Sequence, residues 1–324
     1  MTPMLLAPLE LVYGSLVRAR NARFDRMAVQ RLRWPVVSVG NLSVGGAGKT
    51  PLVICLARLL ERAGIHSDVL SRGYGRSRKT AERVDAEGSA QRFGDEPLLI
   101  ARATGVPVYV AASRYEAGLL AERELPVEGK HVHLLDDGFQ HRQLARNVDI
   151  VVMHASDLRE RLLPGGRLRE PLPGLGRANV IVLRHEDKGL ETQLRAYTRK
   201  ECLFWRVRRT VSLAIPSKRA VAFCAIARPS EFFAALAEAG AEMVERISFR
   251  DHHRYTAADM ERLAKLGQRH GCDAFVVTGK DEVKLDAAMR LRLNAVAPLR
   301  TAALTVELED ESAVLGRLLE LLRI

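Results

Sequence analysis

A glycine-rich segment near the N-terminus contains residue types that could bind the phosphates of a nucleotide. In VVSVGNLSVGGAGKTPLV, an apolar strand candidate, Val36–Val39, precedes the glycines, and a helix candidate, Pro51–Ala63, follows them. Glycines let backbone N–H groups surround phosphate oxygens, and the helix N-terminus adds partial positive charge. Lys49 would reach the β- and γ-phosphates, and the Thr50 hydroxyl would bind Mg²⁺. The predicted nucleotide loop comprises Gly45, Gly46, Ala47, Gly48, Lys49 and Thr50.

One position of this loop departs from the general phosphate-loop pattern. The pattern G-x-x-x-x-G-K-[ST] requires glycine where the chain has Ser43. Gly45 and Gly46 instead give G-G-x-G-K-T, a form found in a variant branch of phosphate-loop proteins. A strand-to-helix turn with a coincidental Lys-Thr pair is the alternative. Because strand, loop and helix are all in place, the sequence favours a nucleotide site.

The segment VHLLDDGFQH places two carboxylates directly after an apolar strand candidate. Asp136 directly follows the strand and Asp137 is next, so both would lie at the sheet edge where phosphates bind. Adjacent carboxylates repel each other unless a cation or hydrogen bonds offset the repulsion. A Mg²⁺ site is therefore favoured over a surface turn. His131 and His133 share one strand face, as metal ligands could, but no third ligand stands at metal spacing, so simple burial or exposure is favoured for them.

Further ionisable residues lie in segments whose local patterns allow two interpretations. Asp95 and Glu96 precede Pro97, which is typical of a helix N-terminus where acids complement the helix dipole. His252, in SFRDHHRYT, could transfer protons in a cleft or lie in a solvated loop. The basic segments RGYGR (72–76) and PGGRLREP (164–171) could hold anionic substrate groups or form surface loops.

The arrangement of strand and helix candidates predicts an α/β fold. Short apolar runs alternate with helical patterns, which indicates a parallel sheet covered on both faces. The runs in the first part are Val36–Val39, Asp68–Leu70, Val108–Val110, Val132–Leu135, Ile150–Met153 and Val180–Leu183. After an extended segment without a helix, a second alternation begins, with strands at Ala220–Ala227, Glu242–Phe249 and Asp273–Thr278.

These patterns divide the chain into a phosphate-loop NTPase-like domain and a smaller second α/β domain. The extended segments at 203–213 and 300–308 could pair as a two-stranded linker and return the last helix, Ser312–Leu322, to the first domain. The predicted divisions are an N-terminal helix (1–33), a nucleotide-binding domain (34–202), a linker strand (203–213), the second domain (214–299), and the return strand with its helix (300–324).

The N-terminal segment predicts a helix with an apolar stripe beside a basic stretch. Arginines 18, 20, 23, 26, 31 and 33 follow leucines, valines and a tyrosine at helical spacing, at positions 5, 6, 9, 12, 13, 16 and 17. This pattern suits a helix lying in an anionic membrane interface. Packing against its own domain is the alternative, and from the pattern alone it is the stronger one.

Composition limits the remaining choices. The 324 residues include 50 Lys+Arg and 39 Asp+Glu, giving a net charge of +11 that favours phosphates, nucleic acid or an anionic membrane as partner. No run approaches the roughly 18 apolar residues of a spanning helix. The four cysteines form no cluster, and no secretory signal is evident, so we expect a cytoplasmic protein. Without a zinc finger, RRM or helix-turn-helix signature, nucleic acid is not an expected partner.

Taken together and in order, the motifs resemble the tetraacyldisaccharide 4′-kinase family of Gram-negative bacteria. The segments are VGNLSVGGAGKTP, RGYGR, GDEP, LLDDGFQH, GGRLREP and FRDHH. The resemblance implies two α/β domains joined by a two-stranded linker. It also implies use of ATP and Mg²⁺ to phosphorylate the 4′-hydroxyl of a lipid A disaccharide 1-phosphate. The expected location is the cytoplasmic face of the inner membrane, on an anionic surface, and a monomer is favoured.

The resemblance assigns roles position by position. Lys49 and the loop hold the phosphates; Thr50, Glu96, Asp136 and Asp137 belong to the metal site. Asp95 matches the catalytic base, and His252 matches a histidine that assists it from the second domain. The residues expected to bind substrate are Arg72, Tyr74, Gln140, His141, Arg167 and Arg169. Gly279 stands where an acidic residue is expected, which weakens any role for Lys280 or Asp281.

A nucleotide-driven switch or chaperone from the same phosphate-loop branch is the competing function. Such proteins often need a guanine-recognising [NT]-K-x-D segment. The chain has Thr278-Gly-Lys-Asp281, whose lysine is one residue late, and this mismatch argues against GTP.

The resemblance also bears on the N-terminal helix. A kinase whose lipid substrate is embedded in a bilayer would need contact with that bilayer. The resemblance therefore favours the interfacial interpretation of this helix.

Overall fold

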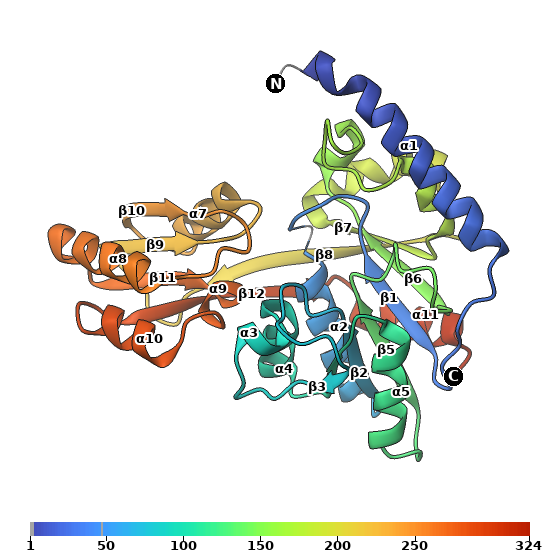
Figure 1. Cartoon of the computed structure of the whole chain (residues 1–324), viewed down its shortest axis with the longest axis horizontal. Helices are drawn as coiled ribbons and strands as arrows, with labels where there is room; N and C mark the ends of the chain where they lie inside the picture. Colours follow the sequence, from blue (N-terminus) through green and yellow to red (C-terminus); the bar gives the residue numbers. More distant parts are fainter. Residues whose placement is uncertain (1–2, 47) are drawn as a thin grey trace.

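The computed structural model describes residues 3–46 and 48–324, so Ala47 of the predicted nucleotide loop lies outside the described residues. One twelve-stranded sheet runs through the molecule in the order β10-β9-β11-β12-β8-β7-β6-β1-β5-β2-β4-β3 (Figure 1). The strands are β1 (Val36–Gly40), β2 (His66–Ser71), β3 (Glu82–Arg83), β4 (Val108–Val110), β5 (His131–Asp136), β6 (Val148–Val152), β7 (Val180–Arg184), β8 (Leu203–Ser212), β9 (Ala220–Cys224), β10 (Met243–Ser248), β11 (Ala274–Thr278) and β12 (Leu299–Leu308).

Helices connect these strands. The α-helices are α1 (Pro3–Arg26), α2 (Lys49–Arg62), α3 (Ala90–Phe93), α4 (Asp95–Thr104), α5 (Arg114–Glu124), α6 (Glu191–Leu194), α7 (Pro229–Glu238), α8 (Ala257–His270), α9 (Gly279–Glu282), α10 (Ala287–Asn294) and α11 (Glu311–Leu322). Short 3₁₀ turns are η1 (Ala155–Arg159), η2 (Leu172–Arg177), η3 (His185–Leu190) and η4 (Arg195–Tyr197). The mixed α/β fold with a mostly parallel sheet confirms the predicted fold class.

The strands that build the nucleotide side of the sheet are parallel and buried on both faces. β1 lies between β5 and β6, and every residue of β1, β5 and β6 is buried. Because parallel strands end at the same edge, the loop after β1 and the acidic pair after β5 meet there. The largest apolar cluster lies between this sheet and helices α2, α4 and α11.

The two extended segments, β8 and β12, pair in antiparallel orientation near the centre of the sheet. β8 pairs with β12 in a register that runs from Ala303 opposite Ser212 to Leu308 opposite Val207. β8 also pairs in parallel with β7, and β12 pairs in parallel with β11, so the sheet continues through both strands. α11 then packs on the first part of the chain, where Val314 and Leu318 join the main apolar cluster, as predicted for the last helix. The division into two domains, with its boundaries, stays a prediction.

Helix α1 lies across the outside of the first part of the chain and packs against it along one side (Figure 1). Val17 is buried, and the Tyr13 hydroxyl donates a hydrogen bond to the Arg169 carbonyl oxygen at 3.0 Å. Leu9, by contrast, is 51% exposed and Leu16 is 63% exposed. The two interpretations of the predicted stripe therefore each describe part of it, because the stripe divides between a packed side and an open side.

A buried ionic cluster fixes the opposite edge of the sheet from the nucleotide loop. The His133 ring, fully buried, contacts Asp68 through Nδ1 at 2.8 Å and Glu122 through Nε2 at 3.4 Å. The His131 ring stacks on Trp34 with centroids 4.1 Å apart. Burial lowers the pKa of His133, but the two carboxylates outweigh it and raise that pKa to about 9. These histidines therefore hold the segment that enters β1, and no metal cluster is found among the described residues.

Candidate active site

The phosphate loop leads from β1 into α2 with the geometry that anion binding requires. α2 begins at Lys49, after Gly48 in the left-handed region at φ 89°, and no side chain caps its first N–H groups. Those N–H groups therefore stay available for phosphate oxygens. Gly45, also left-handed at φ 94°, lies so close to Ala227 that an added Cβ would approach that residue's Cβ to 2.8 Å. A side chain at Gly45 is thus excluded by both backbone and neighbours.

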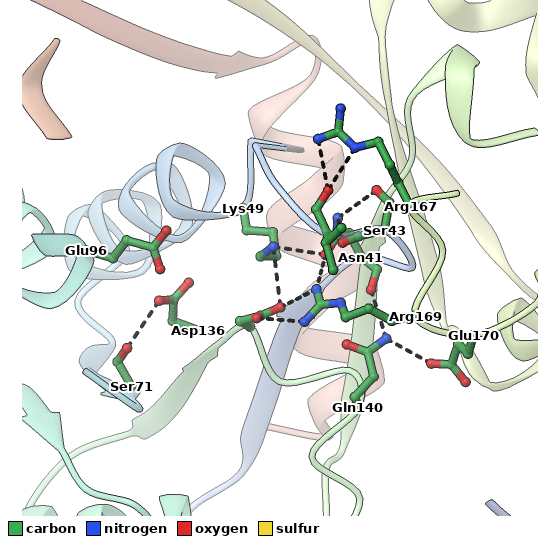
Figure 2. A network of polar contacts seen from close by, with 12 residues as sticks. Asn41, Ser43, Lys49, Ser71, Glu96, Asp136, Gln140, Arg167, Arg169 and Glu170 are labelled. Atoms are coloured by element: carbon green, nitrogen blue, oxygen red, sulfur yellow. Dashed lines mark hydrogen bonds and ion pairs between the residues drawn. The ribbon is translucent and has the colours of Figure 1, made fainter. Parts of the chain in front are cut away.

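Asn41, fully buried, organises the base of the loop (Figure 2). Its Oδ1 accepts a hydrogen bond from Lys49 Nζ at 2.9 Å, and its Nδ2 donates to the Ser43 carbonyl oxygen at 2.8 Å. Nδ2 also lies 3.1 Å from Ser43 Oγ. Serine at the position where the general pattern has glycine therefore supplies an extra acceptor that fixes Asn41, and Asn41 in turn orients Lys49.

The paired carboxylates after β5 have different environments. Asp137, at φ 50°, accepts two hydrogen bonds from Arg169, at 2.9 and 2.8 Å, and lies 3.4 Å from Lys49 Nζ. Burial alone would raise its pKa, but Lys49 and Arg169 outweigh burial and hold the pKa of Asp137 well below its usual range. Asp136 is buried with one carboxylate oxygen bonded to Ser71 Oγ at 3.2 Å. Asp137 is thus held by two cations, whereas Asp136 has no cation within ion-pair distance among the described residues.

Asp136 is the better candidate to hold a divalent cation. Burial, together with the neighbouring Glu96 and Asp137, raises the pKa of Asp136 to about 7. Its Oδ1 is buried without any hydrogen-bond partner among the described residues. Figure 2 shows the Glu96 and Asp136 carboxylates side by side. A hard cation such as Mg²⁺ would offset this like-charge repulsion and take oxygen ligands, so the residues present fit the predicted ion.

The predicted base and its partner histidine meet although they lie far apart in sequence. His252 Nδ1 is 3.0 Å from Asp95 Oδ2, and Asp95 Oδ1 accepts a hydrogen bond from the Glu96 N–H at 3.0 Å. Burial raises the pKa of Asp95, but the His252 hydrogen bond and the nearby Lys280 charge outweigh it, so that pKa is lowered. The hydrogen bond with Asp95 raises the pKa of His252 above its usual value. The two groups form one proton-sharing pair.

Lys280 joins this pair to the carboxylates of the metal site. Its Nζ lies 2.9 Å from Glu96 Oε1 and 3.4 Å from His252 Nε2. Burial lowers the pKa of Lys280, but Glu96 and Asp95 outweigh burial and raise it. Asp281, the other residue that the Gly279 mismatch placed in doubt, is fully buried and accepts hydrogen bonds from the Ala225 N–H and the Thr278 hydroxyl. Lys280 therefore faces the site, whereas Asp281 shapes the turn behind it.

The predicted substrate residues have several locations. Arg167 and Arg169 lie on a segment that pairs with the phosphate loop, because the Val44 N–H donates to the Arg167 carbonyl oxygen at 2.7 Å. Arg167 also donates to the Val44 carbonyl oxygen from Nη2 at 3.0 Å. This basic segment is therefore a strap on the loop, which differs from the surface loop that its composition alone predicts.

Of the other predicted substrate residues, some are hydrogen-bonded or buried within the protein and others are exposed to solvent. Gln140 donates hydrogen bonds to the Asn41 carbonyl oxygen and to Glu170, both at 2.9 Å. Burial and the charges of Arg114 and Arg146 lower the pKa of His141 to about 4. Arg72 is exposed, and the exposed Tyr74 ring lies 5.3 Å from the His252 ring. Substrate binding by all six residues stays a prediction.

The comparisons with known proteins agree with this geometry. Residues 2–323 match the family model described as tetraacyldisaccharide-1-P 4′-kinase. The chain is 44% identical over 327 residues to a tetraacyldisaccharide 4′-kinase of Koribacter versatilis, covering 97% of this chain and 98% of the relative. The chain belongs to the tetraacyldisaccharide 4′-kinase family.

Two further relatives extend the agreement. A tetraacyldisaccharide 4′-kinase of Anaeromyxobacter dehalogenans is 37% identical over 346 residues, covering 98% of this chain and 89% of the relative. A crystal structure of LpxK from Aquifex aeolicus, titled as a complex with ATP, is 30% identical and superposes with a TM-score of 0.77 over 99% of this chain and 100% of that one. The predicted membership of the tetraacyldisaccharide 4′-kinase family, and with it kinase activity, is confirmed.

Some residues of this 4′-kinase site were not predicted from the sequence. Asn41, Glu170 and the buried Arg114 carry no motif of their own, although Asn41 lies in the segment that follows β1. Glu170 is 1% exposed and accepts from Gln140 and from Arg177, which stacks over the Phe139 ring. Asn41 and Glu170 lie inside the segments VGNLSVGGAGKTP and GGRLREP, and this position in the predicted loop and the basic segment was the only available signal.

We expect Asp136→Asn to remove most of the stabilisation that Mg²⁺ gives to this 4′-kinase. With a non-hydrolysable ATP analogue present, Mg²⁺ at about a hundred times its Kd should stabilise the unchanged protein by about 3 kcal/mol. The amide of the variant would lack the charge that attracts the ion, so Tm should respond little to Mg²⁺ in differential scanning calorimetry. Asp149→Asn is the matched control, because Asp149 is also buried but pairs with Arg146 at 3.1 Å near the opposite sheet edge. An equal Mg²⁺ response in Asp136→Asn would remove Asp136 from the metal site.

Proposed function

We propose that this chain transfers the γ-phosphoryl group of ATP to the 4′-hydroxyl of a tetraacyldisaccharide 1-phosphate. The observation that supports this most directly is a row of charged groups that begins at Lys49, which pairs with Asp137 at the phosphate loop. Asp136 and Glu96 come next, close enough that, besides burial, Glu96 raises the pKa of Asp136, and Lys280 contacts both Glu96 and His252. This row connects the group that would hold the donor phosphates to the groups that would activate an acceptor hydroxyl. Family membership supports the donor and the acceptor.

In the proposed reaction the chain's own residues bind, orient and take the proton. The α2 N-terminus and Lys49 would hold the β- and γ-phosphates, with Thr50 at the start of the same helix. Mg²⁺, held by Asp136 with Glu96 and Thr50, would supply charge neutralisation to the phosphates when bound. Asp95 and His252 together would accept the proton of the acceptor hydroxyl as it attacks. Because phosphoryl transfer depends mainly on positioning and charge, the loop and Lys49 should supply most of the rate.

The test is transfer of labelled phosphate to lipid. Purified protein would be incubated with γ-labelled ATP, Mg²⁺ and a lipid A disaccharide 1-phosphate in mixed micelles. Two controls would run beside it, one without lipid and one with the 4′-phosphorylated product as acceptor. Label on the lipid, absent with the blocked acceptor, would support the proposal. ATP hydrolysis at the same rate with and without the lipid would instead favour a nucleotide-driven switch.

We also propose that α1 places the enzyme on the anionic cytoplasmic face of the inner membrane. The described residues contain no helix long and apolar enough to cross a bilayer. On α1, Leu9, Val12 and Leu16 are each more than half exposed, whereas Val17 is buried. Arginines exposed on the same helix would meet anionic headgroups, at positions 18, 20, 23 and 26. An acceptor with four acyl chains would reach the site from such a surface.

We expect Leu16→Glu to weaken binding to vesicles of anionic phospholipid by about tenfold, because it removes apolar area and adds repulsive charge. Cosedimentation with vesicles measures the bound fraction. Leu291→Glu is the matched control, since Leu291 is 73% exposed on a different helix, α10. Both changes leave packed residues untouched, so both proteins should fold. Equal vesicle binding by the two variants would assign α1 to packing alone.

A further inference from the structure

A groove of about 750 Å³ runs along the outer edge of the sheet, far from the phosphate loop in sequence and in the sheet order. One wall is β10, the terminal strand, and the other is helix α8. Ile247 and Leu266 supply apolar lining, whereas most other lining residues are charged. In Figure 1, β10 and α8 lie at the end of the molecule remote from α1.

The charged lining of this groove has an excess of cations. Arg262, Lys265 and Arg269 are three and four residues apart on α8, so they form one stripe, and all three are exposed. The groove's two carboxylates are already engaged, Glu245 with His270 at 3.3 Å and Glu261 with Lys265 at 3.5 Å.

The arginines of the groove, in contrast, form no ion pair with a carboxylate of the described residues. Within the described part of the chain, no carboxylate lies within ion-pair distance of the cationic groups of Arg246, Arg262 or Arg269, and Arg246 is exposed as well. Their positive charge is therefore available to a ligand.

The open edge of β10 supplies backbone hydrogen-bonding groups to the same groove. In the part of the chain that the structure describes, β10 pairs only with β9, and the Phe249 N–H donates to the Cys224 carbonyl oxygen on that side. Because backbone groups alternate along a strand, those of Arg246 and Ser248 then point to the open edge. Neither residue has a backbone hydrogen bond outside the sheet among the described residues.

We propose that this groove binds an extended acidic segment of a partner protein, which adds to the sheet as a strand beside β10. Addition to an open edge satisfies backbone groups, and side-chain contacts with the neighbouring helix give specificity. Carboxylates on the added strand would meet Arg262, Lys265 and Arg269. A strand accounts for the observations better than an isolated anion, because an anion uses the cations but leaves the unpaired edge of β10 unexplained. The inference does not depend on the proposed kinase reaction.

The experiment uses the full chain and a fluorescent peptide of alternating glutamate and valine, with binding measured by fluorescence anisotropy. We expect saturable binding that the double change Arg262→Glu and Arg269→Glu weakens by about tenfold. A peptide N-methylated on alternate backbone nitrogens should bind far less, because it cannot complete the ladder. Hydrogen exchange at the Arg246 and Ser248 amides should slow when the unmodified peptide is bound.

The matched control is the double change Arg62→Glu and Arg317→Glu, which alters net charge equally at exposed ion pairs elsewhere. It should leave peptide binding intact, and Tm shows whether each variant is folded. Equal loss in both double variants, or no effect of N-methylation, would mean non-specific charge attraction and overturn the proposal. Absence of binding would overturn it too, and would mean that the cations only keep the edge from pairing. Loss of anionic-vesicle binding without loss of peptide binding in Arg262→Glu/Arg269→Glu would make the groove a membrane contact and equally overturn it.

Discussion

Lys49→Ala should lower the rate of phosphoryl transfer by about 10³-fold or more. The lysine is the only side-chain cation of the G-G-x-G-K-T loop, and its Nζ is fixed by Asn41 Oδ1 at 2.9 Å at the start of α2. Alanine would keep the helix, since no cap depends on Lys49, and Arg169 would still pair with Asp137. The loss should therefore appear in kcat, measured as label transferred from ATP to lipid.

A second measurement separates catalysis from folding. Lys200→Ala removes an equal charge at an exposed position remote from the loop in sequence, so its rate and Tm should match those of the unchanged protein. Lys49→Ala should keep its Tm without nucleotide but lose most of the stabilisation that Mg²⁺ and an ATP analogue provide. Transfer retained within tenfold of the unchanged rate would refute the assignment of Lys49 to the phosphates.

The parts of the site that the sequence predicts are those encoded within one segment. An apolar strand, glycines and Gly48-Lys49-Thr50 specify the loop locally, because each residue's role depends on near neighbours. The same holds for Asp136 at the end of β5 and for the strands of the sheet, several of which the apolar runs located within two residues at each end. Local pattern and local structure agree in these segments.

The parts that local pattern could not predict depend on which distant segments meet. Asp95 fits a helix N-terminus and His252 fits a solvated loop, and only the fold brings them to 3.0 Å. Likewise, nothing in the basic strap specifies that Arg169 binds Asp137 rather than a substrate. Lys280 illustrates the same limit, since its 2.9 Å contact with Glu96 spans 184 positions of the chain. The family resemblance connected the first pair but gave no reason to expect the other two.

The Asp95–His252 pair carries the second large expected effect. We expect Asp95→Asn and His252→Ala each to slow transfer by about 10²–10⁴-fold, the usual contribution of general-base catalysis. The double variant should be little slower than the worse single variant, because two groups that share one proton act as a unit. A double-mutant cycle on kcat measures this coupling. Additive losses would show that the two residues act separately despite their contact.

The pH profile tests the same pair by a route that a merely structural role would not affect. The pair must be unprotonated to accept the hydroxyl proton, so the rate of the unchanged enzyme should fall as pH decreases through the pKa of His252. The hydrogen bond with Asp95 raises that pKa above 6.5. In Asp95→Asn the carboxylate no longer favours the imidazolium, so the acid limb of the slower residual rate should move to lower pH. His253→Ala is the control, since His253 contacts Asp259 at 2.9 Å on the other side of the turn and should leave the limb in place. An acid limb that does not move in Asp95→Asn would mean that His252 is not the titrating group, and the pair could then contribute only by positioning the acceptor.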